Sequence, residues 1–423
     1  TLPEYTFSIS TGYNSATNFQ DAPGLPDYSL NGLSFDSGVN DLPFSSIINF
    51  PRPVNITNAQ QEALLVSSTK AFTRQMGVSR ENNLLDYSIG GTASNQYNIN
   101  DKIAIGYIAS MNYKYDSDYY KNTINRSVAV RNGTQQEFDA QEGELGSIQA
   151  IASGLFGVSL KTGSFKHKAT ILAIRSGESN GFDGIIEDYI ENPYSGVTNT
   201  MTHTQRDILT VPFSGIYRLG DKLSFDWKVA PSVVKVRDID FRKSVFNVLP
   251  NGTRIIDNSS SALPLRLWRD LEEYGLSAKA DLKYSFNLFG SEGNNLKLGV
   301  AYNNKSRDFG TDVFSIGYRG SSLDLQGDYD NILNPNFIWN STKGVGSFVI
   351  GDYQPTNQYE AENTTIGGYL STELRLSEKL KAILGVRYES YNVLYSGQAI
   401  SGEVYRDSEF IDVADIYPSA NCI

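Results

Sequence analysis

The residues that most often carry metal or nucleophile chemistry are scarce in this chain of 423 residues, which has two histidines and one cysteine. His167 lies in the segment FKHKATILAIR, and Ser164 and Ser176 are available in sequence for the serine–histidine pair of a hydrolase. We expect instead that His167 is an ordinary strand residue at a lumen or an interface, and that His203, in THTQRD, is a loop residue. The single Cys422 excludes a disulfide scaffold and a cysteine-based zinc cluster.

Carboxylates gather in the segment DLQGDYDN, where Asp324, Asp328 and Asp330 offer oxygen ligands of the kind that Ca²⁺ prefers. Their spacing does not match an EF-hand loop, so we expect a solvated acidic loop. The HExxH, GxxxxGK[ST] and CxxC motifs are absent from the sequence. We therefore predict that the protein is not an enzyme, and we assign no catalytic residue, no metal site and no cofactor.

Two further segments combine aromatic rings with polar groups, residues 114–120 (KYDSDYY) and Asn334–Trp339 (NPNFIW). We expect both on long loops, where rings can stack on a sugar or a chelate while polar groups orient it. For any single ring we favour the alternative, a place in the aromatic girdle of a membrane interface. The substrate-binding residues therefore stay unassigned.

Composition narrows the class of protein. The 36 Lys and Arg residues against 47 Asp and Glu residues give a net charge of −11, which argues against a nucleic-acid binder. Mean hydropathy is −0.32, and no stretch approaches the ~18 apolar residues of a transmembrane helix, so helical membrane proteins are excluded. The aromatic content of 12% and the 37 glycines indicate a β-rich fold.

Residues 102–115 (KIAIGYIASMNYKY) alternate strictly, with apolar and aromatic side chains on one face and mostly polar or small ones on the other. Ile108 is the one exception. Comparable patterns predict about eleven strands. Several alternate for about 10–14 residues, whereas an ordinary strand has about 5–6 and a tilted membrane-crossing strand needs about 9–11. The other predicted strands lie near residues 5–13, 85–94, 148–160, 165–175, 209–217, 223–229, 276–286, 296–302, 364–376 and 380–391.

Short and long connections are predicted to alternate between these strands, as in outer-membrane barrels with short periplasmic turns and long extracellular loops. The short links lie near 98–101, 162–164, 220–222, 289–295 and 377–379. The long segments lie at about 15–83, 116–142, 176–204, 238–268, 310–363 and 396–415. Aromatic side chains near strand ends would suit interfacial girdles, namely Tyr113, Tyr115, Phe286 and Phe289.

These patterns predict an all-β fold, an antiparallel transmembrane β-barrel. Backbone groups in hydrocarbon must all be paired, so such a sheet has to close on itself. Single-chain bacterial barrels have even strand counts, and residues 417–423 resemble the opening of a further strand. The residues that begin at Thr1 do not have the pattern of a signal peptide. We therefore expect residues 1–423 to be one incomplete barrel domain from the interior of a longer protein, without a plug domain.

Several stretches resemble the barrel portion of TonB-dependent outer-membrane receptors from Bacteroidota. Residues 1–19 resemble the first barrel strand, and residues 32–43 (GLSFDSGVNDLP) a first-loop signature in which Asn40 stands where an Arg is common. Residues 364–390, ending in a GxRYE pattern, are the most specific match. Other similar stretches are residues 223–242, 296–309 and 416–423, where Cys422 is unusual.

The resemblance implies that this chain forms about 11–12 strands of a barrel that has about 22 strands. It also implies a plug inside the barrel and a TonB box, and neither of these is visible in this sequence. It implies energy-coupled uptake of a nutrient such as a siderophore, glycan or peptide across the bacterial outer membrane. The partners implied are outer-membrane lipid, the TonB–ExbB–ExbD system and a surface lipoprotein, with no nucleic acid. The alternatives are a passive porin or structural barrel subunit, and a soluble β-rich glycan-binding or adhesion protein.

Overall fold

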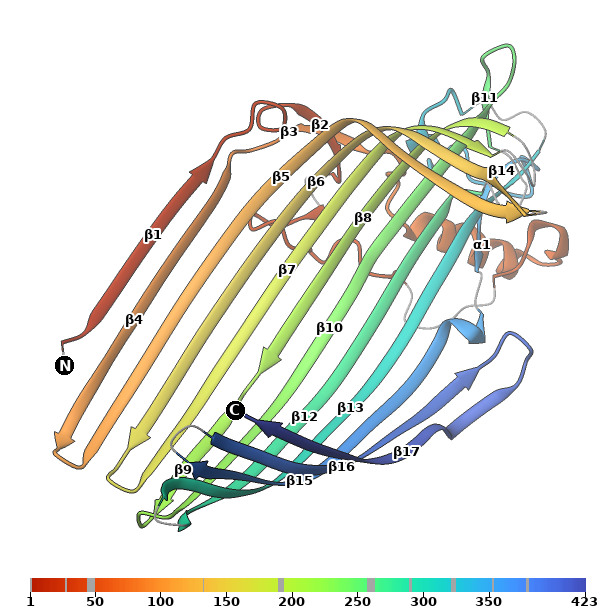
Figure 1. The fold of residues 1–423 in the computed structure, drawn as a ribbon. Helices are drawn as coiled ribbons and strands as arrows, with labels where there is room; N and C mark the ends of the chain where they lie inside the picture. The colour runs from red at the N-terminus through yellow and green to blue at the C-terminus, as the bar shows by residue number, and fades with distance from the viewer. Residues whose placement is uncertain are drawn as a thin grey trace.

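The computed structural model describes residues 2–26, 29–43, 50–131, 133–188, 194–256, 263–288, 291–320, 325–351, 354–377 and 380–423. Its dominant element is one large sheet in which every strand pairing is antiparallel. Figure 1 shows the long strands side by side in chain order. The all-β, antiparallel class predicted from the periodicity is therefore confirmed.

Twelve strands follow one another across the sheet, in the order β1-β4-β5-β6-β7-β8-β10-β12-β13-β15-β16-β17. Strands β9, β11 and β14 pair with members of this path, and β2 pairs with β3 in a separate two-stranded sheet. In the described part of the chain β1 and β17 are the two edges, and they do not pair with each other. The strands are β1 (Glu4–Gly12), β2 (Asp21–Gly24), β3 (Ser79–Asn82), β4 (Asp86–Asn100), β5 (Ile103–Arg131), β6 (Thr134–Lys161), β7 (Phe165–Asp188), β8 (Tyr194–Thr210), β9 (Phe213–Leu219), β10 (Leu223–Val248), β11 (Arg254–Ile255), β12 (Leu265–Leu288), β13 (Ser291–Arg319), β14 (Gly346–Gly351), β15 (Gln358–Ser377), β16 (Leu380–Gln398) and β17 (Val404–Cys422).

The helical segments are few. One α-helix, α1 (Ala59–Ala71), is capped by the Asn58 side chain, which accepts from the Gln61 backbone N–H. The short 3-10 helices among the described elements are η2 (Pro53–Asn55), η3 (Tyr329–Asn331) and η4 (Pro355–Asn357). None of the helices in the described residues is long and apolar enough to cross a membrane.

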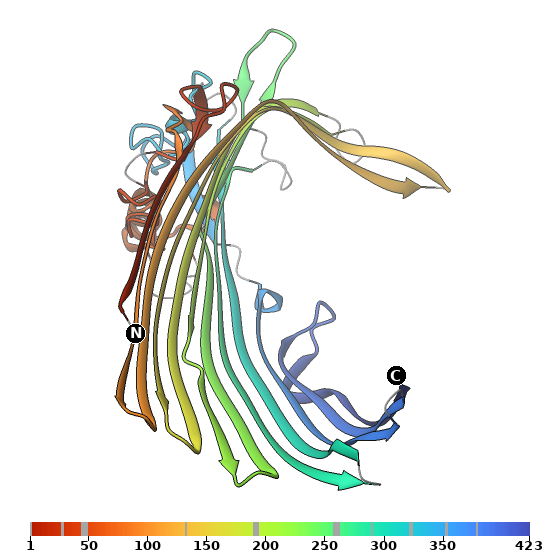
Figure 2. The ribbon, with the colours of Figure 1, turned by 60° about the vertical axis from the view of Figure 1, so that its left-hand side comes forward.

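The strand register aligns the alternating patterns of neighbouring strands. Ile105 lies opposite Tyr97 of β4, and Leu282 lies opposite Phe225 of β10 and Leu298 of β13. Apolar side chains of successive strands therefore share one face of the sheet, and mostly polar side chains share the other. Figure 2 shows that the sheet curves like an open trough, which gives it a concave and a convex face.

The convex face is the apolar one. Segments outside the sheet lie against its upper half on the convex side (Figure 2), and they contact Trp268. Trp268 and Leu282 of β12 are an even number of residues apart, so both side chains point to that face.

Below the covered part, large apolar side chains of the convex face are exposed. Ile105 is 42% exposed and Leu282 is 38% exposed, and in the described residues no second sheet packs over them. We call this region the apolar belt. Its exposed members are Phe7, Ile89, Ile105, Met111, Phe156, Ile171, Leu209, Phe213, Leu276, Leu282, Leu296, Leu298, Val300, Ile366, Leu370, Leu384 and Val386.

A line of charges bounds the apolar belt at its upper edge. Arg175, Asp207, Lys235 and Glu272 lie directly opposite one another on β7, β8, β10 and β12. Arg175 Nε lies 2.5 Å from Asp207 Oδ1, and Lys235 Nζ lies 2.7 Å from Glu272 Oε1. We call these four residues the charged row.

Aromatic rings mark the two margins of the belt. Near the short turns, ring pairs join neighbouring strands, with centroids 6.1 Å apart for Phe165 and Tyr217 and 6.2 Å for Tyr217 and Phe225. Near the charged row, the Tyr87 and Tyr113 ring centroids are 5.8 Å apart. Tyr115, predicted beside them, is instead buried, and Phe289 lies outside the described residues.

The upper half of the convex face carries the main hydrophobic core. It is covered by described residues of 14–83 and 325–345, which we call the loop assembly and which includes α1. The core comprises Phe50, Leu65, Phe72, Met76, Phe246, Trp268, Phe314, Ile316, Leu325, Ile332, Leu333, Trp339 and Val349. Glycines of the sheet permit the close approach of β2, because a Cβ at Gly146 would lie 2.1 Å from the Pro23 carbonyl oxygen.

The short connections predicted near 98–101, 162–164 and 220–222 are confirmed, because the flanking strands end and begin at those residues. At 289–295 and 377–379 the flanking strands also lie close in sequence, although residues 289–290 and 378–379 are outside the described part.

The prediction of long loops at the end of the sheet opposite the short connections is wrong for several segments. Residues 116–142 are mostly strand, because β5 and β6 continue as a long hairpin, and 396–415 are mostly β16, β17 and a short turn. The segments 176–204, 238–268 and 310–363 likewise begin and end inside strands. Above the belt one face no longer has to be apolar, so the alternation that revealed the strands fades while backbone pairing continues.

Candidate functional site

The concave face of the sheet, behind the apolar belt, carries paired charges. Asp281 accepts a hydrogen bond from the Tyr369 hydroxyl at 2.5 Å, and its Oδ2 lies 3.2 Å from Lys279 Nζ and 3.6 Å from Lys297 Nζ. These residues come from β12, β13 and β15, whose apolar neighbours point to the convex face. The arrangement suits a surface that contacts water or a polar solute.

A second charge cluster lies further up the same face. Glu273 Oε1 is 3.2 Å from Lys305 Nζ, and its Oε2 is 2.5 Å from an Arg307 guanidinium nitrogen. Because Lys305 and Arg307 alternate with Asn304 and Ser306 along β13, both cations point to the concave face. Each of the two clusters on the concave face therefore contains both signs of charge.

Above these charges, five aromatic rings form a continuous run on β13, β15, β16 and β17. Ring centroids are 5.1 Å apart for Phe309 and Tyr359 and 5.9 Å for Tyr359 and Tyr395. Tyr405 and Phe410 follow, at 6.1 Å and 5.2 Å from Tyr395. We call these five rings the aromatic run. Such a surface can stack against a flat ring or an apolar sugar face.

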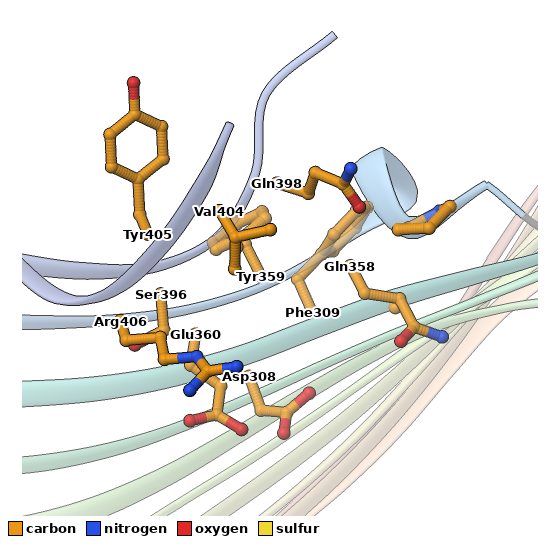
Figure 3. A pocket seen from close by; sticks show the side chains of 13 residues that line it. Asp308, Phe309, Gln358, Tyr359, Glu360, Ser396, Gln398, Val404, Tyr405 and Arg406 are labelled. Atoms are coloured by element: carbon orange, nitrogen blue, oxygen red, sulfur yellow. The ribbon is translucent and has the colours of Figure 1, made fainter. Parts of the chain in front are cut away.

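On the opposite, convex face of the same strands lies a polar pocket of about 510 Å³ (Figure 3). In Figure 3 the Tyr405 side chain extends away from Asp308, Glu360 and Arg406, which gather on the other side of the strands. Asp308 and Glu360 are cross-strand partners. The pocket has a mainly polar lining, and no serine–histidine or metal-ligand set lies among its described lining residues.

A buried carboxylate, Asp240, pairs with two arginines that hold the loop assembly to the sheet. Asp240 sits in a β-bulge of β10 with a positive φ of 54°, a conformation that Asp tolerates better than most residues. Its carboxylate accepts from Arg242 Nε at 2.9 Å and from Arg266 Nε at 2.7 Å. All three side chains are buried.

The two arginines extend this contact to the loop assembly. Arg242 donates to the Gln75 carbonyl at 2.8 Å and to Asn40 Oδ1 at 2.7 Å. Arg266 donates to the Thr73 carbonyl at 2.7 Å and packs over the Phe72 ring. Removing the Asp240 charge would leave two buried guanidinium groups without their shared partner.

Asn40, the position where the resembled family commonly has Arg, belongs to this cluster. Its side chain accepts from Arg242, and its backbone carbonyl accepts from Trp268 Nε1 at 2.8 Å. A neutral acceptor at this position suits the two arginines that already surround Asp240.

His203 was predicted in a loop, and this is wrong, because it lies in β8. Its Nδ1 is 2.7 Å from the Ser179 hydroxyl, and the residue is 3% exposed. Burial lowers the pKa of His203 to about 4. The neutral ring therefore packs beneath the loop assembly at ordinary pH.

Sequence reasoning overlooked this pair, although Gly177–Gly181 (GESNG) has the spacing GxSxG. In hydrolases that motif forms an exposed strand-to-helix turn. Here Ser179 is buried within β7, and the flanking glycines make room for neighbours, since a Cβ at Gly177 would lie 3.0 Å from the Ser34 carbonyl oxygen. The pair therefore has a packing role in this structure.

The other residues considered from sequence are placed as follows. His167 lies on the convex face against Phe165 and Tyr217, and no hydrogen bond among the described residues joins it to Ser164 or Ser176. Residues 114–120, predicted on a loop, are part of β5, and Trp339 is buried in the core rather than at a loop tip.

The acidic segment has a structural role in its described part, and Asp324 lies outside that part. Asp330 Oδ1 accepts from the backbone N–H groups of Met76 and Gly77, and Asp328 Oδ1 accepts from the Asp330 N–H. Within the described residues no group of three or more acidic, His or Cys side chains could hold a metal ion.

Comparison with protein-family models and with curated proteins finds no match for this chain.

Proposed function

We propose that this chain is part of the wall of an outer-membrane β-barrel, and that the barrel belongs to a TonB-dependent receptor that imports a nutrient. The observation that carries the proposal is the difference between the two faces of the sheet. Ile105, Leu282 and their neighbours form an exposed apolar belt on the convex face, whereas the concave face carries paired charges. In a barrel, these faces meet lipid and lumen.

The height of the apolar belt supports this proposal. Tyr274 lies beside the charged row and Tyr284 lies near the short turn, ten residues apart on β12. Ten residues span about 33 Å along a strand, which a tilt of about 40° reduces to about 25 Å. An apolar band of about this height, with aromatic rings at both margins, is typical of outer-membrane barrels.

The energy-coupled step and the nutrient rest on the family resemblance. The aromatic run and the Glu273 cluster line the upper concave face, where an entering solute would first contact this wall. Rings give contact area and charges give orientation, so this surface is the proposed capture site.

The test uses the intact parent protein in its own cells. Recovery of the protein only after detergent treatment of the membrane fraction is expected, and release into buffer without detergent would contradict the barrel. Growth on the imported nutrient is expected to stop when TonB is deleted. Unchanged uptake after that deletion would favour the passive porin instead.

A further inference from the structure

A group of lysines lies on the concave face near the short turns, on β6, β7, β10, β12 and β13. We call this group the lysine wall. Its members alternate along each strand with side chains of the convex face, as Lys166 and Lys168 do on either side of His167. Two carboxylates, Asp226 and Asp281, lie among them on the same face. The lysine wall comprises Lys161, Lys166, Lys168, Lys228, Lys279, Lys283 and Lys297.

The strand register places lysines of the wall directly opposite one another. Like charges in directly opposed positions destabilise an antiparallel sheet. A negative charge held against this face would relieve the repulsion. The opposed pairs are Lys161 with Lys166 on β6 and β7, Lys228 with Lys279 on β10 and β12, and Lys283 with Lys297 on β12 and β13.

The carboxylates among the lysines neutralise only part of this charge. Asp281 lies within salt-bridge distance of both Lys279 and Lys297, so one carboxylate serves two ammonium groups. Among the described residues, Lys168 and Lys228 have no salt bridge. The seven lysines and two aspartates have a net charge of +5, in a chain whose net charge is −11.

The positive charge is confined to one part of the concave face. On β4 and β5 the concave side chains are mostly small or uncharged, among them Thr92, Ser94, Ser110 and Asn112. The Thr92 and Ser110 hydroxyls bond to each other at 3.1 Å. A lysine ammonium group is a compact, hydrated charge on a flexible stem, so the lysine wall provides an attractive field rather than a rigid two-point contact.

We propose that the lysine wall attracts anionic solutes along the lumen, and that the nutrient imported by the parent protein carries carboxylate or phosphate groups. A cleft lined by one sign of charge raises the local concentration of the opposite ion, and anion and phosphate pores use basic side chains in this way. The inference rests on the proposed function, which makes the concave face the lumen. An acidic protein surface is the other occupant that lysines could meet, and the experiment distinguishes it.

The experiment compares how fast thiol reagents of opposite charge react with two cysteines in the detergent-purified full-length protein, in a Cys422→Ser background. Ser214 lies on the concave face directly opposite Lys168 and Lys228, so Ser214→Cys reports on the lysine wall. Ser110→Cys, in the uncharged section on β5, is the matched control. The reagents are methanethiosulfonates that carry either a sulfonate or a trimethylammonium group.

The ratio of sulfonate to trimethylammonium labelling rates is expected to be at least tenfold higher at Ser214→Cys than at Ser110→Cys in low salt. Raising the salt from about 10 mM to about 1 M should bring the two ratios together, because the Debye length falls from about 30 Å to about 3 Å. Replacing both Lys168 and Lys228 with Gln should lower the ratio at Ser214→Cys in the same way.

Equal ratios at the two cysteines in low salt would overturn the inference. Failure of both reagents to label Ser214→Cys, with normal labelling of Ser110→Cys, would mean that a protein surface covers the lysine wall and would overturn it as well. Release of the protein from cells without detergent would instead contradict the barrel, so failure of this inference and failure of the proposed function are distinguishable.

Discussion

The convex face of the sheet has two halves that differ in what covers them. On β12, Trp268 is 5% exposed beneath the loop assembly, whereas Leu282, on the same strand and face, is 38% exposed. The upper half therefore buries its apolar groups as a water-soluble protein does. The lower half leaves a contiguous apolar surface uncovered, and such surfaces mark contact with a partner or a membrane.

The two halves also use charge differently. In the covered half, Asp240 and its two arginines are buried, and the arginines donate to backbone carbonyls of the loop assembly. At the boundary of the uncovered half, the charged row is partly exposed, and its two salt bridges join neighbouring strands. The buried cluster fixes a tertiary contact, whereas the row marks where the apolar surface ends.

The largest effect is expected at Asp240. Asp240→Asn leaves two buried guanidinium groups underpaired and should weaken docking of the loop assembly by about 3–5 kcal/mol. The matched control is Asp238→Asn on the same strand, because Asp238 pairs with half-exposed Arg269 at 3.2 Å and should cost less than about 1 kcal/mol. Hydrogen exchange of α1 measures both changes. Equal protection in the two variants would contradict the role assigned to Asp240.

A charge placed on the uncovered half should have the next largest effect. Val300 is exposed on the convex face and Ala301 lies on the concave face of the same strand. In a bilayer Val300→Arg should cost about 2–4 kcal/mol, because arginine enters hydrocarbon, whereas Ala301→Arg points to the lumen. Urea unfolding in lipid vesicles measures the difference. If both variants were as stable as the parent, the belt would not be in lipid.

The covered half should respond to acid through His203. Its folded-state pKa of about 4 lies below the ordinary value of 6.5, so the unfolded state binds the proton more readily. The contribution of neutral His203 to the free energy of unfolding is therefore fully present above pH 6.5. It falls by about 2 kcal/mol at pH 5 and reaches its minimum below pH 4. His203→Gln should flatten this dependence, measured by proteolysis of the loop assembly, and His167→Gln in the belt should not. A persistent slope in His203→Gln would exclude His203 as its source.

The aromatic run should show the smallest effect. Tyr395 contacts three other rings of the run, so Tyr395→Ala should destabilise the β16–β17 hairpin by about 1 kcal/mol. Tyr388→Ala, on the convex face of the same strand, is the comparison. Hydrogen exchange of residues 404–410 is the measurement, and faster exchange in Tyr388→Ala than in Tyr395→Ala would argue against the run as a structural unit.

The belt was predictable from sequence because burial on one face imposes a period of two. The alternation at residues 102–115 predicts which side chains of β5 share a face, and the register agrees, since Ile105 lies opposite Tyr97 and Leu160. Strand ends at the short turns were also predictable, because Gly220 and similar turn residues separate the patterns.

The covered half was not predictable in the same way. Above the belt, Tyr119 and His203 are buried by contacts with a distant segment, and no local period records them. The Asp240 cluster joins residues more than 160 positions apart, so spacing gives no signal for it. The Ser179–His203 pair did carry a local signal, the GESNG spacing, although its setting within a strand removes the usual meaning.

The most direct test of the contrast between lipid and lumen uses two adjacent residues of β12. Ala278 lies on the convex face and Ser277 on the concave face, and a Cys422→Ser background removes the native thiol. With the full-length protein in vesicles, a water-soluble maleimide should label Ser277→Cys at least tenfold faster than Ala278→Cys. Equal labelling of the two cysteines, or faster labelling of Ala278→Cys, would contradict a lipid-facing belt.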